Sequence, residues 1–586
     1  MAAESGKGAG PKRPMSVRYS KDMESSAPFF WMNGILATDL VEVSSDLARI
    51  ETVGFWAVAI TFEGEPTFAR FATVQRDQPF PPTAPWSHLQ STWKSSLDRE
   101  QYYAYVEEIR KNIAKGVVYQ ANACRVLSTS FNGPSLASLF AEILQDNPAP
   151  YASFLKLPDI EIASASPELF LQKNGREVVT SPIKGTQDPR TTERFGLKDQ
   201  SENIMIVDLM RNDLSRICET GSIEVTDFLR TEIHPGVRHL VSDVRGTLSA
   251  GITWEEIFQG LLPAGSISGA PKLSAIQIIA DNEPLVRDVY CGVIGWIEGS
   301  DSLLALAIRT FWLSSQTLSF GAGAGITWPS DPHLEWRETE LKANRLLGIA
   351  GGIDEEGWPF GTGIFETVLV KDGTPLLFER HMQRARASAK ELGIELPSQE
   401  SILREIAQHR SLPLARVRLC FGNQFSLAMA PYEHHGRALK VRVLEDQSVA
   451  GIGSHKSFPY WTNLDLLRAV NFEGFDEVLL VSESGVVGEG ATCNFLFHLD
   501  GQWVTPPLSS GVLPGVMRAV ALEMGVATEG NISRSDLDRV ESMMALSSLR
   551  IASPVSILGD RELIQGPQSD LVFEILWTLA QSDSVG

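Results

Sequence analysis

Apolar residues in the first 330 positions alternate between short strand-like runs and helical spacing. Between 98 and 115 they recur every three to four residues, which predicts an amphipathic helix that ends at Gly116. Further helices are predicted over 200–216, 254–262 and 270–281, and strands over 31–75, 117–131, 160–172, 290–297, 302–313 and 316–323. The last two strands are joined by a turn at Ser314 and Ser315. Because the alternation lacks a regular βαβ order, the pattern predicts an α+β fold.

A strong helix start follows at Asp331 and Pro332, and the helical pattern runs to Gly348. The next stretch, 350–357, is rich in glycine and acidic residues and is typical of a linker. Beyond it the apolar pattern restarts. We therefore predict a disordered tail at 1–30, a first domain at 31–349, the linker at 350–357 and a second domain at 358–586.

The composition narrows the class of protein. A chain of 586 residues with 43% hydrophobic residues is too long for one core. Its net charge of −21 would repel nucleic acid and anionic membranes, and no apolar run reaches membrane-spanning length. The five cysteines are far apart and form no C-x-x-C pair, which favours a reducing compartment. We expect a cytoplasmic protein without nucleic-acid or membrane partners.

Lys184 stands in the stretch SPIKGTQDP, between a proline-led apolar pair and a Gly-Thr turn. A lysine held still and partly desolvated there would favour its neutral, nucleophilic form. An ordinary solvated loop lysine is the alternative. The neighbouring motifs must decide between these two interpretations of Lys184.

Two acidic pairs lie on predicted helices, Asp199 with Glu202 and Glu335 with Glu338. Spacing of i,i+3 places both carboxylates of a pair on one helical face. Two such faces brought together would suit Mg²⁺, which prefers oxygen ligands. A solvated acidic surface is the alternative in a chain with 72 Asp and Glu.

Glycine-rich segments follow several predicted strands. The segment PAGSISGAPK carries Ser266 and Ser268 and places Lys272 at the start of a helix, where anions bind readily. The segment GAGAGI exposes backbone amides, including those of Gly323 and Gly325, and Arg309 offers a planar fork for a carboxylate. Each alone is equally consistent with a tight turn or a core salt bridge. Together they indicate a cleft for a small dianion.

The motifs IAKGVVYQAN, SASPELF, SPIKGT, DQSENIMIVDLMRNDLSRI, PAGSISGAPK, YCGVIGW, AIRT, GAGI and SDPHLEWRETELKA occur in this order over about 100–350. In order and wording they resemble the chorismate-utilising enzymes, which bind a dicarboxylate with Mg²⁺. The resemblance implies a large two-sheet α/β sandwich. Anthranilate synthases resemble P-I-A-G-T at the position where this chain has P-I-K-G-T, as in aminodeoxychorismate synthases.

The resemblance also implies roles for individual residues. Lys184 would attack C2 of chorismate, and Glu168 would protonate the departing C4 hydroxyl, for which burial must raise its pKa. Ammonia would then enter at C4 and displace the lysine. Glu202, Glu338, Glu335 and Asp199 would hold Mg²⁺, with Asp199 acting through water because relatives have glutamate there. Substrate contacts are implied at Ser266, Ser268, His239, Tyr290, Arg309, Gly323, Gly325 and Lys342, although His239 could equally be a satisfied core histidine.

The second half carries a different set of groups. The helix pattern LLFERHMQRARASAKELGI contains Arg384, HKSFPYW contains Lys456, and SGVVGEGATCNFLF contains Glu489 and Asn494. In VLPGVMR, Gly515 precedes a helix start that could seat a phosphate. A lysine, a carboxylate, an arginine and a phosphate seat are what pyridoxal phosphate requires.

Over most of 358–586, order and wording resemble the class IV aminotransferase fold, although Thr362 stands where many relatives have aspartate. The resemblance implies Lys456 as the lysine that carries the cofactor and Glu489 as the partner of its pyridine nitrogen. Further cofactor contacts are implied at Arg384, Asn494, Gly515, Val516, Met517 and Ser547.

Together the two resemblances imply a bifunctional enzyme that aminates chorismate and then eliminates pyruvate to leave 4-aminobenzoate. Because the chain has no Cys-His-Glu glutaminase pattern, free ammonia or a separate glutamine amidotransferase would supply nitrogen. Class IV relatives commonly dimerise, so a homodimer through the second domain is possible. The alternatives are anthranilate or isochorismate synthesis with a transaminase-type second domain, and a second domain that only docks or dimerises.

Overall fold

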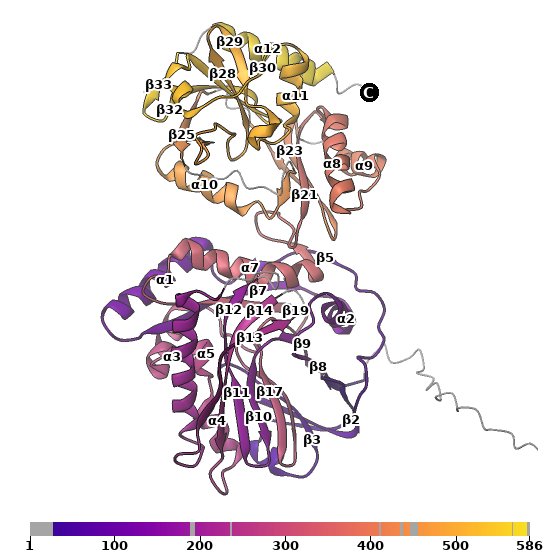
Figure 1. The fold of residues 1–586 in the computed structure, drawn as a ribbon. Helices are drawn as coiled ribbons and strands as arrows, with labels where there is room; N and C mark the ends of the chain where they lie inside the picture. Colours follow the sequence, from indigo (N-terminus) through magenta and orange to yellow (C-terminus); the bar gives the residue numbers. More distant parts are fainter. Residues whose placement is uncertain are drawn as a thin grey trace, which may run out of the picture. The chain divides into compact units, whose positions relative to one another are not determined.

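The computed structural model describes residues 27–187, 194–234, 237–408, 412–433, 437–445, 455–564 and 567–582. These residues form two compact units (Figure 1). The first contains the described chain up to Ser87 together with Lys94–Ala343, and the second contains His88–Trp93 together with the chain from Asn344. Both units mix helices with strands, which confirms the α+β prediction. Most of the predicted tail lies outside the described residues, and the first strand already begins at Phe29, within that prediction.

Backbone hydrogen bonds link the strands of the first unit into one 18-stranded sheet. The two sheets expected from the sequence are therefore joined. The strands are β1 Phe29–Met32, β2 Ile35–Ser44, β3 Phe55–Ile60, β4 Pro66–Gln75, β6 Lys94–Ser95, β7 Gln120–Ser130, β8 Tyr151–Lys156, β9 Ile160–Ser166, β10 Leu169–Asn174, β11 Glu177–Ser181, β12 Ile183–Gln187, β13 Glu224–His234, β14 Val237–Thr247, β15 Gly269–Ala270, β16 Val293–Glu298, β17 Asp301–Leu306, β18 Thr310–Ser314 and β19 Thr317–Ile326.

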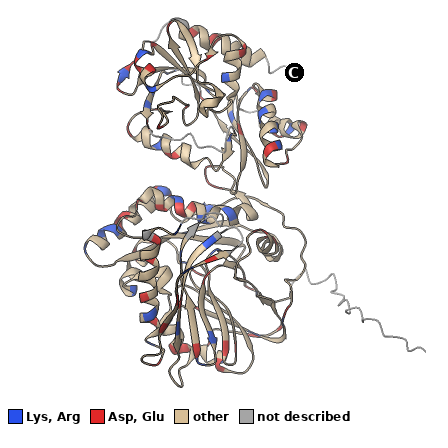
Figure 2. Ribbon diagram, viewed as in Figure 1, with Lys and Arg blue, Asp and Glu red and all other residues tan. Residues whose placement is uncertain are grey.

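The predicted helix over 98–115 is α1, and it begins with a capping box. Asp98 accepts from the backbone of Gln101, whose side chain bonds back to the Asp98 N–H. Charged side chains of both signs lie along α1 and α7 (Figure 2). The helices of this unit are η1 Leu47–Glu51, α1 Arg99–Ala114, α2 Ala137–Asp146, α3 Leu197–Leu214, α4 Trp254–Leu261, α5 Gly265–Ser268, α6 Lys272–Asn282 and α7 Pro332–Ala350, the last of which extends into the second unit.

The predicted strand over 302–313 is wrong in one respect, because it is broken in two. Arg309 has a positive φ of 52° between β17 and β18. The two pieces pair with different neighbours, β17 with β10 and β16, and β18 with β9 and β19. Positive φ values at Ser315 and Gln316 form the turn between β18 and β19, one residue after the predicted turn.

The second unit contains two larger sheets, besides a two-stranded sheet described below. One joins β21 Gly363–Lys371, β22 Thr374–Pro375, β23 Leu414–Phe421, β24 Phe425–Pro431 and β26 Ser457–Phe458. The other joins β25 Leu439–Leu444, β27 Glu477–Leu480, β28 Asn494–Leu499, β29 Gln502–Thr505, β30 Thr528–Glu529, β31 Ser542–Ser547, β32 Ile551–Leu558 and β33 Arg561–Glu562. The helices are α8 Phe378–Leu392, α9 Gln399–Ala407, α10 Trp461–Phe472, η2 Leu508–Ser510, α11 Val516–Glu523, η3 Arg534–Arg539 and α12 Pro567–Ser582.

The stretch predicted as a linker has secondary structure of its own. Within it, β20 Gly351–Ile353 pairs in parallel with β5 Leu89–Thr92, and both strands belong to the second unit. The Trp93 indole N–H donates to the carbonyl of Gly351 at 2.9 Å. A residue 258 positions away in sequence therefore anchors this stretch, and local composition cannot show such a contact.

Among the described residues, the structure contains no helix that is both long and apolar enough to span a membrane.

Candidate active sites

Glu168 lies in the short connection between β9 and β10 and is only 5% exposed. Its backbone N–H donates to the Ser166 hydroxyl at 3.2 Å. Its carboxyl accepts hydrogen bonds from the Ser266 side chain and the Ile183 backbone. Burial raises the pKa of Glu168 to about 7, although the positive charge of Lys184 opposes the shift. Glu168 can therefore hold a proton near neutral pH.

Lys184 lies on β12, and its Nζ donates to the backbone carbonyl of Ser266 at 3.3 Å. The next residue, Gly185, has a positive φ of 69°, and a Cβ there would lie 2.8 Å from the ring of Phe195. Only glycine fits this bulge without displacing that ring. The imidazole Nδ1 of His239, on the neighbouring strand β14, lies 3.2 Å from the Gly185 carbonyl. The bulge therefore brings the His239 ring against the backbone that follows Lys184.

Ser266, in the short helix α5, connects several of these groups. The Ser266 hydroxyl bonds to Glu168, and the Ser266 carbonyl accepts from both Lys184 and the Asn122 amide, the latter at 3.3 Å. Ser268 has a different role, because its buried hydroxyl donates to the carbonyl of Ala264 at 2.8 Å. In this geometry Ser268 stabilises the short helix α5.

Lys342, on α7, contributes a second cation near Glu168. Its Nζ donates to the Gly323 carbonyl at 2.9 Å and pairs with Glu338 at 2.6 Å. The positive charge of Lys342 is one of the influences that lower the pKa of Glu168. The structure therefore brings together Glu168, Lys184, Ser266 and Lys342, which the sequence places on four separate segments.

Two other predicted groups, Lys272 and Tyr290, have contacts within the fold. Lys272 pairs with the buried carboxylate of Asp213 at 2.7 Å, so this lysine is used within the fold. The buried ring of Tyr290 packs against Gly321, where a Cβ would come within 1.9 Å of the ring. Arg309 is half buried at the break between β17 and β18. Tyr290 and Arg309 stay predictions as substrate contacts.

The four carboxylates predicted to hold magnesium have different surroundings. Glu335 is 4% exposed, Glu338 pairs with Lys342, Glu202 is half buried, and Asp199 lies beside Gly185. Within the described ranges, no group of three His, Cys, Asp or Glu side chains could hold a metal ion. The magnesium ligands stay a prediction, and the proposed steps below use only the side chains of this chain.

The second unit contains a cavity of about 310 Å³, a size typical of a small-molecule site. It is lined by segments from both of that unit's sheets. The lining includes all the predicted cofactor contacts, Arg384, Lys456, Glu489, Asn494, Gly515, Val516, Met517 and Ser547. The fold therefore gathers at one cavity residues that lie 163 positions apart in sequence, from 384 to 547.

Lys456 and Glu489 are two titratable groups that line this cavity. Burial lowers the pKa of Lys456 to about 8, helped by the positive charge of Arg384. Burial raises the pKa of Glu489 to about 7. Glu489 accepts from the Asn494 amide at 2.8 Å and from the Leu513 N–H at 2.9 Å. These bonds hold its carboxyl in place.

Arg384 is oriented by a buried carboxylate that the sequence analysis does not single out. Its Nε and Nη2 donate to Glu366 at 2.8 and 2.6 Å, and Nη1 donates to the Pro514 carbonyl at 3.1 Å. His381 also bonds Glu366, at 2.7 Å. Burial alone would raise the pKa of Glu366, but the charge of Arg384 holds it at about 2. Three of the five guanidinium donors are used, which leaves two for a phosphate.

The predicted phosphate seat lies at the start of α11. Gly515 is the residue before this helix, and a Cβ there would lie 1.9 Å from Oδ1 of Asn494. The Gly515 N–H itself donates to the Leu513 carbonyl at 2.7 Å, whereas Val516 and Met517 belong to the first turn of α11, whose backbone amides have no partner within the helix. With Lys456, Glu489 and Arg384 around one cavity, the residues fit pyridoxal phosphate.

Several residues at the two sites are absent from the predicted set. Asn122 and Gln120 lie on β7, and the buried Oε1 of Gln120 has no hydrogen-bond partner among the described residues. A Cβ at Gly325 would lie 2.5 Å from the Gln120 amide nitrogen. Tyr460 lines the second cavity, with its ring centre 5.4 Å from Nζ of Lys456. Gln120 and Asn122 lie within the motif IAKGVVYQAN, and Tyr460 lies within HKSFPYW. Membership of these motifs is the sequence signal that could have identified them.

The order of elements and the grouping of these residues define the first unit's class. Residues 36–348, more than half of the chain, match the family of chorismate binding enzymes, and the chain belongs to that family. Residues 363–558 match the amino-transferase class IV family. The two resemblances inferred from sequence motifs are therefore confirmed.

Individual relatives specify the similarity further. Component 1 of aminodeoxychorismate synthase from Escherichia coli (strain K12) is 35% identical over 270 residues, which are 44% of this chain and 59% of the relative. Component 1 of anthranilate synthase from Neisseria meningitidis (serogroup C) is 36% identical over 272 residues, 44% of this chain and 55% of that relative. The chain thus spans about three fifths of the length of the curated relatives that it matches.

Solved structures match this chain with lower sequence identity than these curated relatives do. The menaquinone-specific isochorismate synthase from Escherichia coli is 18% identical, with a TM-score of 0.49, over 57% of this chain and 92% of that one.

Proposed function

We propose that the chain is a bifunctional enzyme of 4-aminobenzoate synthesis. The first unit would aminate chorismate to 4-amino-4-deoxychorismate, and the second would eliminate pyruvate from that product. The proposal depends chiefly on one observation, the protonatable Glu168 that shares Ser266 with Lys184. The amine created in the first reaction is the group that a pyridoxal-dependent site captures.

In the amination, Glu168 supplies a proton. Hydroxide is a poor leaving group, so departure of the C4 hydroxyl requires protonation. With a pKa of about 7, Glu168 is substantially protonated at neutral pH, as a general acid must be. Lys184 is the proposed nucleophile at C2, and ammonia then replaces it by attack at C4. The Ser266 carbonyl that binds Lys184 Nζ orients the amine.

In the elimination, Lys456 moves the proton. The chemistry supplied by bound pyridoxal phosphate is capture of an amine and withdrawal of electrons from the adjacent carbon. A pKa of about 8 leaves a useful fraction of Lys456 neutral, so that Nζ can accept the C4 proton. Glu489, held by Asn494 and Leu513, would face the pyridine nitrogen. The two remaining donors of Arg384 and the amides at α11 would bind the phosphate.

Anthranilate synthesis is the second candidate, because anthranilate synthases match with similar identity. The two candidates differ in the carbon that receives nitrogen, and Lys184 favours 4-amination by resemblance. The deciding experiment incubates the purified chain with chorismate, ammonium, Mg²⁺ and pyridoxal phosphate, then identifies the aromatic product by mass spectrometry and retention time. 4-Aminobenzoate supports the proposal, whereas 2-aminobenzoate or isochorismate contradicts it.

Partners, location and metal are part of the same proposal. Ammonia would come from a separate glutamine amidotransferase, since relatives named component 1 match the first unit. A cytoplasmic location is supported by the five free cysteines, all of them buried. Omitting Mg²⁺ from the assay tests the magnesium prediction, and unchanged amination in the presence of a chelator would contradict it. The homodimer stays a prediction.

A further inference from the structure

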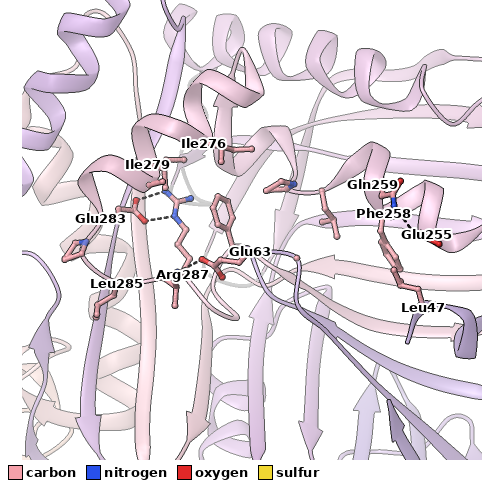
Figure 3. Close-up of a pocket in the computed structure, with 17 residues that line it drawn as sticks. Leu47, Glu63, Glu255, Phe258, Gln259, Ile276, Ile279, Glu283, Leu285 and Arg287 are labelled. Carbon is pink, nitrogen blue, oxygen red and sulfur yellow. Dashed lines mark hydrogen bonds and ion pairs between the residues drawn. The ribbon is translucent and has the colours of Figure 1, made fainter. Parts of the chain in front are cut away.

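The first unit contains a second, larger cavity that neither proposed site uses. It measures about 650 Å³ and lies among η1, the turn after β3, α4, α6 and the segment 283–287 (Figure 3). Sites for small organic molecules typically occupy 300–1,000 Å³. None of Glu168, Lys184, Ser266 or Lys342 lines it.

The walls of this cavity are mostly apolar. Phe62 and Phe258 contribute aromatic rings, and Ile276 and Ile279 contribute one face of α6. All four side chains are at least partly buried. These walls suit a ligand with an aromatic or aliphatic body.

The charged groups in the lining favour a cation. The lining contains three carboxylates, Glu63, Glu255 and Glu283, and one arginine, Arg287, so its formal charge is −2. Arg287 donates to both oxygens of Glu283, at 2.8 and 2.6 Å, and these two charges neutralise each other (Figure 3). The oxygens of Glu63 accept from the backbone N–H groups of Arg287 and Asp288, at 2.8 and 3.1 Å. A carboxylate has about four acceptor positions, so Glu63 can accept further donors.

An anion would find little to bind at the same place. Arg287 is 1% exposed, and four of its five donors are used. Two bond Glu283, one bonds the Ile267 carbonyl at 3.0 Å, and one bonds the Asn122 carbonyl at 2.8 Å. The available charge in this cavity is therefore negative, on Glu63 and Glu255.

The wall of the cavity is also connected to the amination site. Arg287 holds the backbone carbonyls of Asn122 and Ile267, and Ile267 follows Ser266 directly. The Asn122 amide donates to the Ser266 carbonyl, which also accepts from Lys184. A ligand that shifts Arg287 would therefore shift the groups that position Lys184.

We propose that this cavity is an effector site for a small organic cation with an apolar body, and that its occupancy changes chorismate binding through Arg287. An arylalkylammonium ion has the required chemistry. Binding in the cavity is independent of the proposed reaction. Only the effect on chorismate involves the amination site.

The first test compares two probes of similar size and opposite charge by isothermal titration calorimetry on the full chain. We expect 2-phenylethylammonium to bind at least about tenfold more tightly than 3-phenylpropionate, since a charge-assisted hydrogen bond contributes about 1.5–3 kcal/mol. Glu63→Gln removes one charge and Ala280→Trp fills the space from an exposed position on α6. Each should weaken ammonium binding about tenfold. Asp281→Asn, an exposed change outside the lining, should leave it unchanged.

The second test measures chorismate affinity directly, with and without saturating 2-phenylethylammonium. We expect at least about a threefold change in the Kd of chorismate, and reciprocally of the probe, which Ala280→Trp abolishes. Failure of both probes to bind, equal binding of both, undiminished binding to Ala280→Trp, or an unchanged chorismate Kd would each overturn the proposal. Because no turnover is measured, failure of the proposed amination would leave this test interpretable.

Discussion

The two proposed sites each place a lysine near a carboxyl whose pKa is raised to about 7, yet they are built differently. Glu168 and Lys184 meet through hydrogen bonds to one residue, Ser266, at the junction of several strands. Lys456 and Glu489 instead line one cavity of about 310 Å³. Burial has the same sign in both units, since it favours the neutral form of every titratable group. The difference lies in which neutral group the chemistry uses.

In the first unit the neutral group is an acid with a proton to donate, and in the second it is an amine that can accept one. Arg384 contributes to this difference, because its charge lowers the pKa of Lys456 while Glu366 holds the guanidinium in place. Glu168 has a cation beside it, Lys184, and its pKa is raised nonetheless. One physical effect would thus prepare the proposed general acid in the first unit and the proposed general base in the second.

Replacing Lys456 should have the largest effect. It should abolish the reaction proposed for the second unit and leave the reaction proposed for the first unit intact. In Lys456→Ala, formation of 4-aminobenzoate from 4-amino-4-deoxychorismate should fall about 10³-fold, because the proton acceptor and cofactor lysine are lost together. Consumption of chorismate with ammonia should continue. Lys440→Ala, an exposed lysine on β25, is the matched control. Retention of more than a tenth of the lyase rate would contradict the assignment.

Glu366→Gln tests whether the second site depends on its buried ion pair. Removing one charge leaves Arg384 buried without its partner, so the free energy of unfolding of the second unit should fall by about 3 kcal/mol. Urea denaturation, monitored separately for each unit, should show that the unfolding transition of the first unit is unchanged. The control is Glu379→Gln, whose carboxylate is 57% exposed. Equal stability of the two variants would show that the pair contributes little.

Glu168→Gln removes the proposed acid of the first site while keeping its shape. The ammonia-dependent rate with chorismate should fall about 10²-fold, within the range for loss of a general acid. Formation of 4-aminobenzoate from added 4-amino-4-deoxychorismate should be unaffected. Glu177→Gln, at an exposed position on β11, provides the control. If the amination rate survives, another group protonates the hydroxyl.

The two units should also respond to pH in opposite directions. The proton on Glu168 is present below its pKa of about 7, so amination at constant free ammonia should fall up to tenfold per unit as pH rises above 7. Lys456 becomes neutral as pH rises, so capture of pyridoxal phosphate by the cofactor-free protein should accelerate up to pH 8 and then level off. Stopped-flow absorbance and product assays measure the two limbs. If both rates rose with pH, or both fell, the contrast between the two units would be wrong.

Much of the fold could be predicted because its signals are local. The spacing of apolar residues identified α1 and α4, and Asp331 with Pro332 marked the start of α7. Motif order identified both families, and it named the residues that line the second cavity. These signals can be read from the sequence because helical periodicity and motif composition depend on residues that are close together in the chain.

Other features depend on partners that are distant in sequence. The apolar run 302–313 suggests one strand, but Arg309 divides it because β17 and β18 pair with different neighbours. The stretch 350–357 has the composition of a linker, yet part of it pairs with β5. Spacing along α7 places Lys342 one turn after Glu338, but it cannot show that Lys342 also donates to the Gly323 carbonyl on β19.

The sequence by itself determined the family, the order of the two units and the chemical groups available to each. The tertiary structure alone decided which groups meet, as Glu168 and Lys184 do at Ser266, and which carboxyl groups burial brings to a raised pKa, as it does Glu168. It also revealed two buried supporting residues. Glu366 accepts from Arg384 in the second unit, and Arg287 donates to the carbonyls of Ile267 and Asn122 in the first. The reason is physical: burial and hydrogen bonding to backbone carbonyls depend on position in space, and no residue pattern along the chain encodes either of them directly.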